Sequence, residues 1–211
     1  MTELRLISGA ALAEPEPAAA APPRLLPGRH GMPADLVRAH QRQRLLAAAA
    51  AALAEQGYGR LTAARVTELA HVSSRTFYQH FEDLWACVLA AYEEQAARLC
   101  DAIERAGAAG AGIAAAIEFL AAEPDVARLL SAEPPPQIAA LAAARRELVE
   151  RLGAMLRAAL AERDGATPLP GLERRLVGAA LALVASRAAG GDPQRLRDLE
   201  PELTELLLAS L

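Results

Sequence analysis

The sequence predicts an all-α protein. Of its 211 residues 53% are hydrophobic but only 3% are aromatic, so the core must be built mainly from Ala, Leu and Val. Ala and Leu are strong helix formers, and the runs of Val, Ile, Thr and Tyr that form strands are missing. Apolar residues recur at helical spacing between Gly and Pro breaks. We therefore expect an N-terminal three-helix unit with a helix-turn-helix, followed by a larger C-terminal helical bundle.

The first 32 residues differ from the rest in composition. The stretch "AEPEPAAAAPPRLLPGRHG" is rich in Ala and Pro, which is typical of a flexible arm. The early Glu3 and the prolines are unlike a signal peptide or a membrane span. We expect an arm at residues 1–32, the helix-turn-helix unit at 33–82 and the larger bundle at 83–211.

The N-terminal unit begins with a long helix predicted over residues 34–56. Pro33 and Asp35 are typical of a helix start, and Gly57 is typical of a helix end. Leu45 and Leu53 lie on its apolar face, and its outer face carries arginines.

Two short helices follow in "LTAARVTELAHVSSRTFYQHF". Thr62 is a good N-cap for a helix over 63–70, and Ser73 caps the next helix. Each cap stands between two apolar residues spaced as a hydrophobic staple. Two short capped helices, three residues apart and with the second one polar, are typical of a helix-turn-helix.

The C-terminal part shows further helical periods from Asp83 to about Ala106, interrupted by Gly and Pro clusters. The remaining helices are predicted at residues 112–122, 125–132, 137–163, 171–189 and 201–210.

Charge is unevenly distributed along the chain. The net charge is −4, yet residues 24–85 hold eight arginines and five acidic residues and are therefore positive. All 22 basic residues are arginine, which suits phosphate recognition but also follows from GC-rich coding. Cys87 and Cys100 form no disulfide framework, so we expect a reducing cytoplasm. They are either buried structural residues or a redox pair, and burial is the favoured interpretation.

The polar second helix has the chemistry to contact DNA. In a helix-turn-helix this helix enters the major groove, and its first turn meets base edges. That turn holds Ser74, Arg75 and Thr76; an arginine can donate two bonds to guanine. Phe77 and Phe81, one turn apart, would anchor the helix to the unit.

The stretch "LLAAAAAALAEQGYGRLTAARVTELAHVSSRTFYQHFEDLWACVLAAYE" resembles the DNA-binding domain of the tetracycline-repressor (TetR) family, over about residues 40–93. The resemblance implies an all-α homodimer that binds a palindromic double-stranded DNA operator and, as a repressor, releases it when a small ligand fills the C-terminal domain. It also implies DNA-contacting positions: Ser74, Arg75 and Thr76 face bases, Gln79 faces base or phosphate, and phosphate contacts or helix caps fall at Thr62, Ser73, Tyr78 and His80.

Two residues depart from the family pattern. The glycine common before "VS" is His71, and a lysine that grips phosphate at the start of the fourth helix is Leu84. Arg42 and Arg44, or Arg24 and Arg29 of the arm, are candidates to replace that contact.

The C-terminal part resembles the family less specifically. Residues 137–163 and 171–189 resemble the two long helices that form the dimer interface, and the small residues Gly178, Ala179, Ala182 and Ala185 would allow close packing there. The scarcity of aromatic residues favours an aliphatic pocket and a lipophilic effector. Its candidate lining residues are Phe119, Leu120, Leu129 and Met155.

Other classes of function have less support. No catalytic motif is present, no cofactor is indicated, and His71 and His80 lack the neighbours that a metal site needs. The alternative that remains open is a helical interaction or ligand-sensing protein with the same fold and little operator binding. Leu84 and the acidic net charge are its support.

Overall fold

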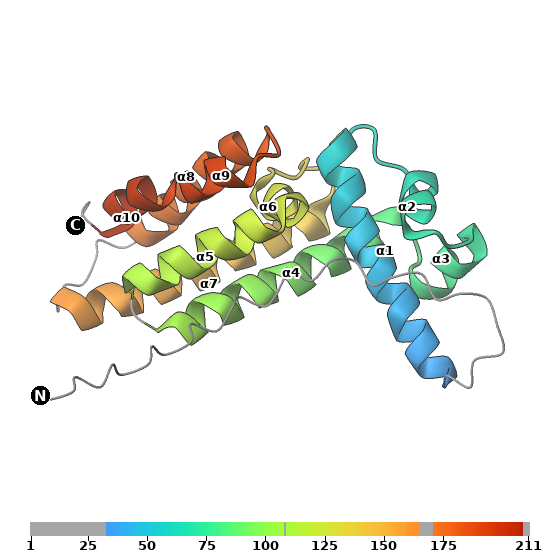
Figure 1. The fold of residues 1–211 in the computed structure, drawn as a ribbon, viewed down its shortest axis with the longest axis horizontal. Helices are drawn as coiled ribbons and strands as arrows, with labels where there is room; N and C mark the ends of the chain where they lie inside the picture. Colours follow the sequence, from blue (N-terminus) through green and yellow to red (C-terminus); the bar gives the residue numbers. More distant parts are fainter. Residues whose placement is uncertain (1–32, 108, 165–170, 209–211) are drawn as a thin grey trace, which may run out of the picture.

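The computed structural model describes residues 33–107, 109–164 and 171–208, and this part of the chain is helical without strands (Figure 1). The predicted arm, with Arg24 and Arg29, lies outside the described residues. The helices are α1 (Ala34–Gln56), α2 (Ala63–Ala70), α3 (Ser74–His80), α4 (Leu84–Ala106), α5 (Ala109–Ala122), α6 (Pro124–Ser131), α7 (Ala139–Asp164), α8 (Leu172–Ala188), α9 (Pro193–Arg197) and α10 (Glu200–Leu208).

The N-terminal helices α1, α2 and α3 lie together at one end of the molecule (Figure 1). Leu45, Leu46 and Leu53 of α1 are buried, and α1 packs against α2, α4 and α6. Helix α4 extends from this unit into the C-terminal bundle, so it belongs to both parts of the fold.

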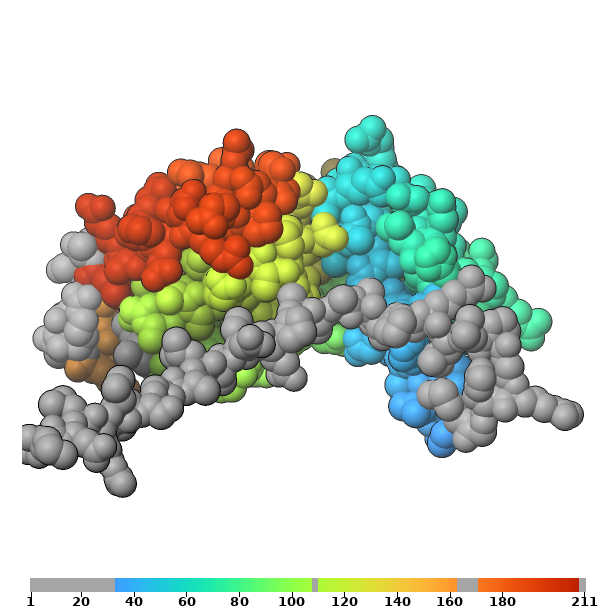
Figure 2. Space-filling view, viewed as in Figure 1, coloured from blue at the N-terminus to red at the C-terminus, as the bar shows by residue number. Residues whose placement is uncertain are grey.

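The C-terminal bundle packs α5 against α4 and pairs α7 with α8. Helices α9 and α10 contact α5 and α8, and they form the outer layer at the end away from α3 (Figures 1 and 2). The buried apolar residues make one continuous core through both units. None of the described helices has the length and apolar character needed to cross a membrane.

The predicted all-α class is confirmed, and the predicted helices occur within a few residues of their expected bounds. Helix α9 was not predicted, because "GGDP" was interpreted only as a break. Asp192 in that break accepts a bond from the Gln194 amide at 2.9 Å, and Pro193 occupies the first helical position. Both features are typical of a helix start.

Candidate DNA-binding surface and ligand cavity

The turn between α2 and α3 sets the direction of the polar helix. The Thr62 hydroxyl caps α2 by accepting from the Arg65 amide at 3.2 Å. Helix α2 ends at His71, whose φ of 50° and ψ of 45° place it in the left-handed region. Glycine is the usual residue in this conformation at the end of a helix. The chain then turns sharply, so that the Val72 amide donates to the Thr67 carbonyl at 3.1 Å.

Arg44 and Arg42, the predicted supplementary phosphate contacts, are both engaged within the protein. The Arg44 guanidinium donates to the carbonyls of Ala70 and His71, which closes the turn. Arg42 lies over the Phe81 ring, 5.7 Å from its centroid, and forms a 3.5 Å ion pair with Glu94. Contact of either arginine with DNA would require these partners to be shared or exchanged.

Helix α3 has one buried side and one exposed side. Ser73 caps it, since its hydroxyl accepts from the Thr76 amide at 3.0 Å. Phe77 is fully buried and Phe81 is buried beside it, with 5.9 Å between the ring centroids. The exposed side carries four of the predicted DNA-contacting residues: Ser74, Arg75, Tyr78 and Gln79.

Thr76 and His80, also predicted to contact DNA, are half-buried. The Thr76 hydroxyl is 2.9 Å from that of Ser73, so the cap occupies part of its bonding capacity. The His80 ring lies 3.4 Å from the Gln41 side-chain oxygen. Burial, followed by the nearby positive charges of Arg38 and Arg42, lowers the pKa of His80. Both effects favour the neutral form of its imidazole, which keeps a hydrogen-bonding nitrogen for DNA.

Arg38 and Arg60 were not among the predicted site residues. Both are exposed, and like Arg75 they have no ion-pair partner within the described part of the chain. Arg60 precedes the cap of α2, and Arg38 lies one helical turn from Arg42 on α1. The four-residue spacing of Arg38 and Arg42 places them on one helix face, and this signal was present in the sequence.

The start of α4 carries no cation. The Asp83 carboxylate caps the helix by accepting from the Ala86 amide at 2.8 Å. Leu84 is half-buried and packs against the core. A phosphate at this helix terminus would face a carboxylate, so the lysine contact of the family has no equivalent at Leu84.

Helix α6 joins the two units through Arg128. Its guanidinium donates to the Ala54 carbonyl near the end of α1 at 3.1 Å, to the Ala188 carbonyl at 2.8 Å and to the Ala189 carbonyl at 3.1 Å. The last two carbonyls lie at the end of α8. One cation thus satisfies the carboxyl ends of two helices, where positive charge is favoured.

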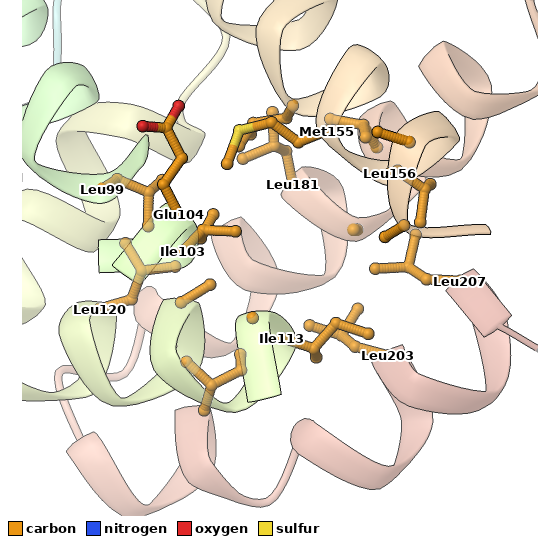
Figure 3. Close-up of a pocket in the computed structure, with 18 of the residues that line it drawn as sticks. Leu99, Ile103, Glu104, Ile113, Leu120, Met155, Leu156, Leu181, Leu203 and Leu207 are labelled. Atoms are coloured by element: carbon orange, nitrogen blue, oxygen red, sulfur yellow. The ribbon is translucent and has the colours of Figure 1, made fainter. Parts of the chain in front are cut away.

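A cavity of about 270 Å³ lies between α4, α5, α7, α8 and α10 (Figure 3). Leu120 and Met155, two of the predicted pocket residues, line it. Phe119 and Leu129 do not line this cavity. The Phe119 ring lies 5.2 Å from the Arg98 guanidinium on another face of α5, and Leu129 is fully buried in the core.

The predicted dimer helices α7 and α8 pack against each other. On α8, Ala179 and Ala182 are exposed, and Gly178 and Ala185 are half-buried. A side-chain carbon added at Gly178 would meet nothing within 4 Å, so the space beside this residue of α8 is open.

The two thiols are buried, as the favoured interpretation of the cysteines predicted. Burial raises the pKa of Cys87 to about 12 and also raises the pKa of Cys100. No group of three or more His, Cys, Asp and Glu residues that could hold a metal ion occurs in the described ranges.

Comparisons with known proteins give a family model that matches part of the chain and solved structures with the same fold. The sequence model described as "Bacterial regulatory proteins, tetR family" matches residues 45–91. No curated protein sequence matches the chain. Among solved structures, the fatty acid degradation regulator FadR from Bacillus halodurans has a TM-score of 0.64 at 18% identity, over 80% of this chain and 98% of that one.

Two further structures are similar. FadR from Bacillus subtilis, in complex with stearoyl-CoA, has a TM-score of 0.58 at 19% identity and covers 80% of this chain and 98% of its own. A transcriptional regulator from Rhodococcus sp. Rha1 has a TM-score of 0.58 at 22% identity, over 79% and 95%. The family match spans α2, α3 and their neighbours, and the likeness of fold extends through the C-terminal bundle. Residues 45–91 therefore match the tetR family of bacterial regulatory proteins, and the fold of the described chain is that of solved transcriptional regulators of this family.

Proposed function

We propose that this protein is a cytoplasmic homodimeric repressor that binds a palindromic operator through α3 and releases it when a small ligand occupies the C-terminal cavity. The observation that carries the proposal is the two-sided helix α3. Phe77 fixes it to the core, while Ser74 and Arg75 in its first turn stand exposed with hydrogen-bond donors. This is the arrangement that a helix needs in order to contact base edges in a major groove.

The dimer is argued from the open face of α8 and the adjoining α7. Ala179, Ala182 and Gly178 would let the same face of a second copy approach closely. A two-fold axis through this face would present two α3 helices to one side of the DNA. Binding requires them to reach successive major grooves, about 34–36 Å apart.

Release by ligand is argued from the position of the cavity. Its walls include α4, which follows α3 directly along the chain. They also include α8, whose end is bonded to α1 through Arg128. A ligand that fits only one arrangement of these helices would shift the dimer towards it. Operator affinity falls if that arrangement changes the distance between the α3 helices.

The DNA-binding part of the proposal is tested with Arg75→Ala and a fluorescently labelled fragment upstream of the protein's own gene. Both subunits of the dimer lose one bidentate arginine contact, each worth about 1–3 kcal/mol, so we expect affinity to fall by roughly 30-fold or more, with relaxed preference at one base pair of each half-site. The measurement is fluorescence anisotropy at one fixed salt concentration.

Arg195→Ala is the control, because it removes the same charge from an exposed position of α9, where the guanidinium has only a loose 4.0 Å contact with Asp192. It should leave the affinity within about twofold, since charges beyond a Debye length are screened. Equal effects of the two substitutions would contradict the assignment of Arg75.

The second candidate function is an interaction protein without operator binding, favoured by the packed Leu84 and the Asp83 cap. The two functions differ in salt dependence. Phosphate contacts release counterions, so the logarithm of the binding constant falls by about 0.9 per contact for each tenfold rise in salt. A slope near zero would favour the second candidate.

A further inference from the structure

The cavity is small for a ligand-binding pocket. Its volume of about 270 Å³ lies just below the range of roughly 300–1,000 Å³ for small-molecule sites. An apolar cavity of about 150 Å³ holds one benzene molecule. By the same ratio of volume to atoms, this cavity holds a ligand of roughly ten non-hydrogen atoms.

The described walls of the cavity are almost entirely aliphatic. They consist of Ala, Gly, Ile, Leu, Met and Val residues, with two exceptions. No described lining residue is aromatic, so these walls offer a ligand no ring to stack on. The body of the ligand must therefore be an aliphatic chain or a small saturated ring, held by burial of its surface.

The two exceptions are Glu104 and Glu162. Glu104 is on the last turns of α4 and Glu162 on the last turns of α7, and both are exposed. Neither has an ion-pair partner within the described part of the chain. Figure 3 shows the Glu104 carboxylate at one edge of the group of apolar side chains. The polar part of the lining is thus negative, without an arginine or histidine among the described lining residues.

This charge decides which head group the cavity accepts. A carboxylate or phosphate at the edge would meet like charges and would lose hydration without gaining a donor. An ammonium group would instead meet carboxylate acceptors, with no competing cation among the described lining residues. Because both acids are exposed, the gain is modest and comparable to that of a surface ion pair.

We propose that the cavity binds a short aliphatic molecule with a cationic amine head, its chain among the apolar walls and its head at Glu104 and Glu162. The inference rests on the proposed function, in which this cavity is the effector site. The proposed ligand differs in both size and charge from stearoyl-CoA, the ligand in the B. subtilis FadR structure. An 18-carbon acyl chain exceeds the volume of this cavity, and the CoA phosphates are anionic.

The test compares octylamine, 1-octanol, octanoate and stearoyl-CoA by isothermal titration calorimetry on the full-length protein without DNA. Octylamine should bind about fivefold more tightly than 1-octanol, and octanoate and stearoyl-CoA should bind more weakly than either. The double variant Glu104→Gln, Glu162→Gln should bind octylamine and 1-octanol equally. Tighter binding of octanoate or stearoyl-CoA, or an unchanged amine preference in the double variant, would overturn the inference.

The location is tested with Ala116→Phe, which fills the cavity from α5. Ala122→Phe, at an exposed position of the same helix, is the matched control. Octylamine binding should fall at least tenfold in the first variant and stay unchanged in the control. Ala180→Phe fills the cavity from α8, so it replaces Ala116→Phe if that variant does not fold. Octylamine that binds a folded, filled variant as tightly as the control would place the amine site elsewhere and sink the inference.

Operator binding is measured separately with the same four compounds. If octylamine binds as described but leaves DNA affinity unchanged, the ligand class stands and ligand-controlled release fails. If stearoyl-CoA binds in the cavity and releases DNA, the regulatory function stands and the amine inference fails.

Discussion

His71 occupies the left-handed region, where residues with a β-carbon are strained by about 1–2 kcal/mol, although histidine is among the residues found there more often. Its side chain is exposed, and its backbone provides the amide that donates to Glu68 and the carbonyl that accepts from Arg44. The residue is therefore held by backbone bonds that any amino acid could make. The strained backbone of His71 is what allows the chain to turn sharply between α2 and α3.

His71→Gly should stabilise the protein by about 0.5 kcal/mol. The relief of strain exceeds the entropy that glycine adds to the unfolded chain, which is about 0.4–1 kcal/mol. Urea unfolding followed by circular dichroism measures the change. His71→Ala keeps a β-carbon in the left-handed region and should give no gain; a gain equal to that of glycine would show that strain is not the cause.

At the scale of elements, the eight-residue helix α6 has a larger role than its length indicates. Arg128 on α6 binds the carboxyl ends of α1 and α8, while the carbonyl of Leu130 accepts from Tyr92 of α4 at 3.5 Å and from Arg145 of α7 at 3.3 Å. Four helices from both units are thus bonded to one short helix. A displacement of α6 would break several of these bonds at once.

Arg128→Ala should destabilise the protein by about 2–4 kcal/mol, because it removes three charge-assisted bonds and leaves two helix ends without their donor. Arg128→Lys keeps the charge but presents it as a single point, so an intermediate loss is expected. Thermal unfolding compares the three proteins. If the lysine variant were as stable as the wild type, charge alone would account for the effect and the geometry of the three bonds would be irrelevant.

The bounds of the helices could be predicted from the sequence better than the contacts between side chains of different helices. Helix bounds followed from caps and breakers such as Thr62, Ser73 and Gly57, whose effects are local. The bonds of Arg128 could not be predicted, because their acceptors are backbone carbonyls with no sequence signature. Phe119 and Leu129 were expected at the pocket, and the structure shows them elsewhere because small rotations of a helix decide which face meets a cavity.

At the scale of the whole molecule, the continuous core makes the two units depend on each other. Trp85, the single tryptophan, lies at the start of α4 and packs against this core, 6.4 Å from the Tyr58 ring between centroids. Helix α1 contributes its buried leucines to α4 and α6 as well as to α2. Neither unit has a complete apolar face without the other.

We expect one cooperative unfolding transition. Trp85 fluorescence reports the junction of the units and circular dichroism reports all helices, so the two urea curves should coincide. Two separate transitions would show that the units fold independently. Dimer formation also affects the unfolding midpoint, so the measurement is repeated at a tenfold lower protein concentration to separate the two effects.

The burial of Cys87 and Cys100 has a practical consequence for measuring this switch. With the pKa of Cys87 raised to about 12, hardly any of its thiol is in the reactive thiolate form at neutral pH. A cysteine introduced at the exposed Gln79 would therefore react alone with a thiol-specific spin label. Pulsed magnetic-resonance spectroscopy of the labelled dimer could then record the separation of the two labels, with and without ligand, while the native thiols stay unmodified.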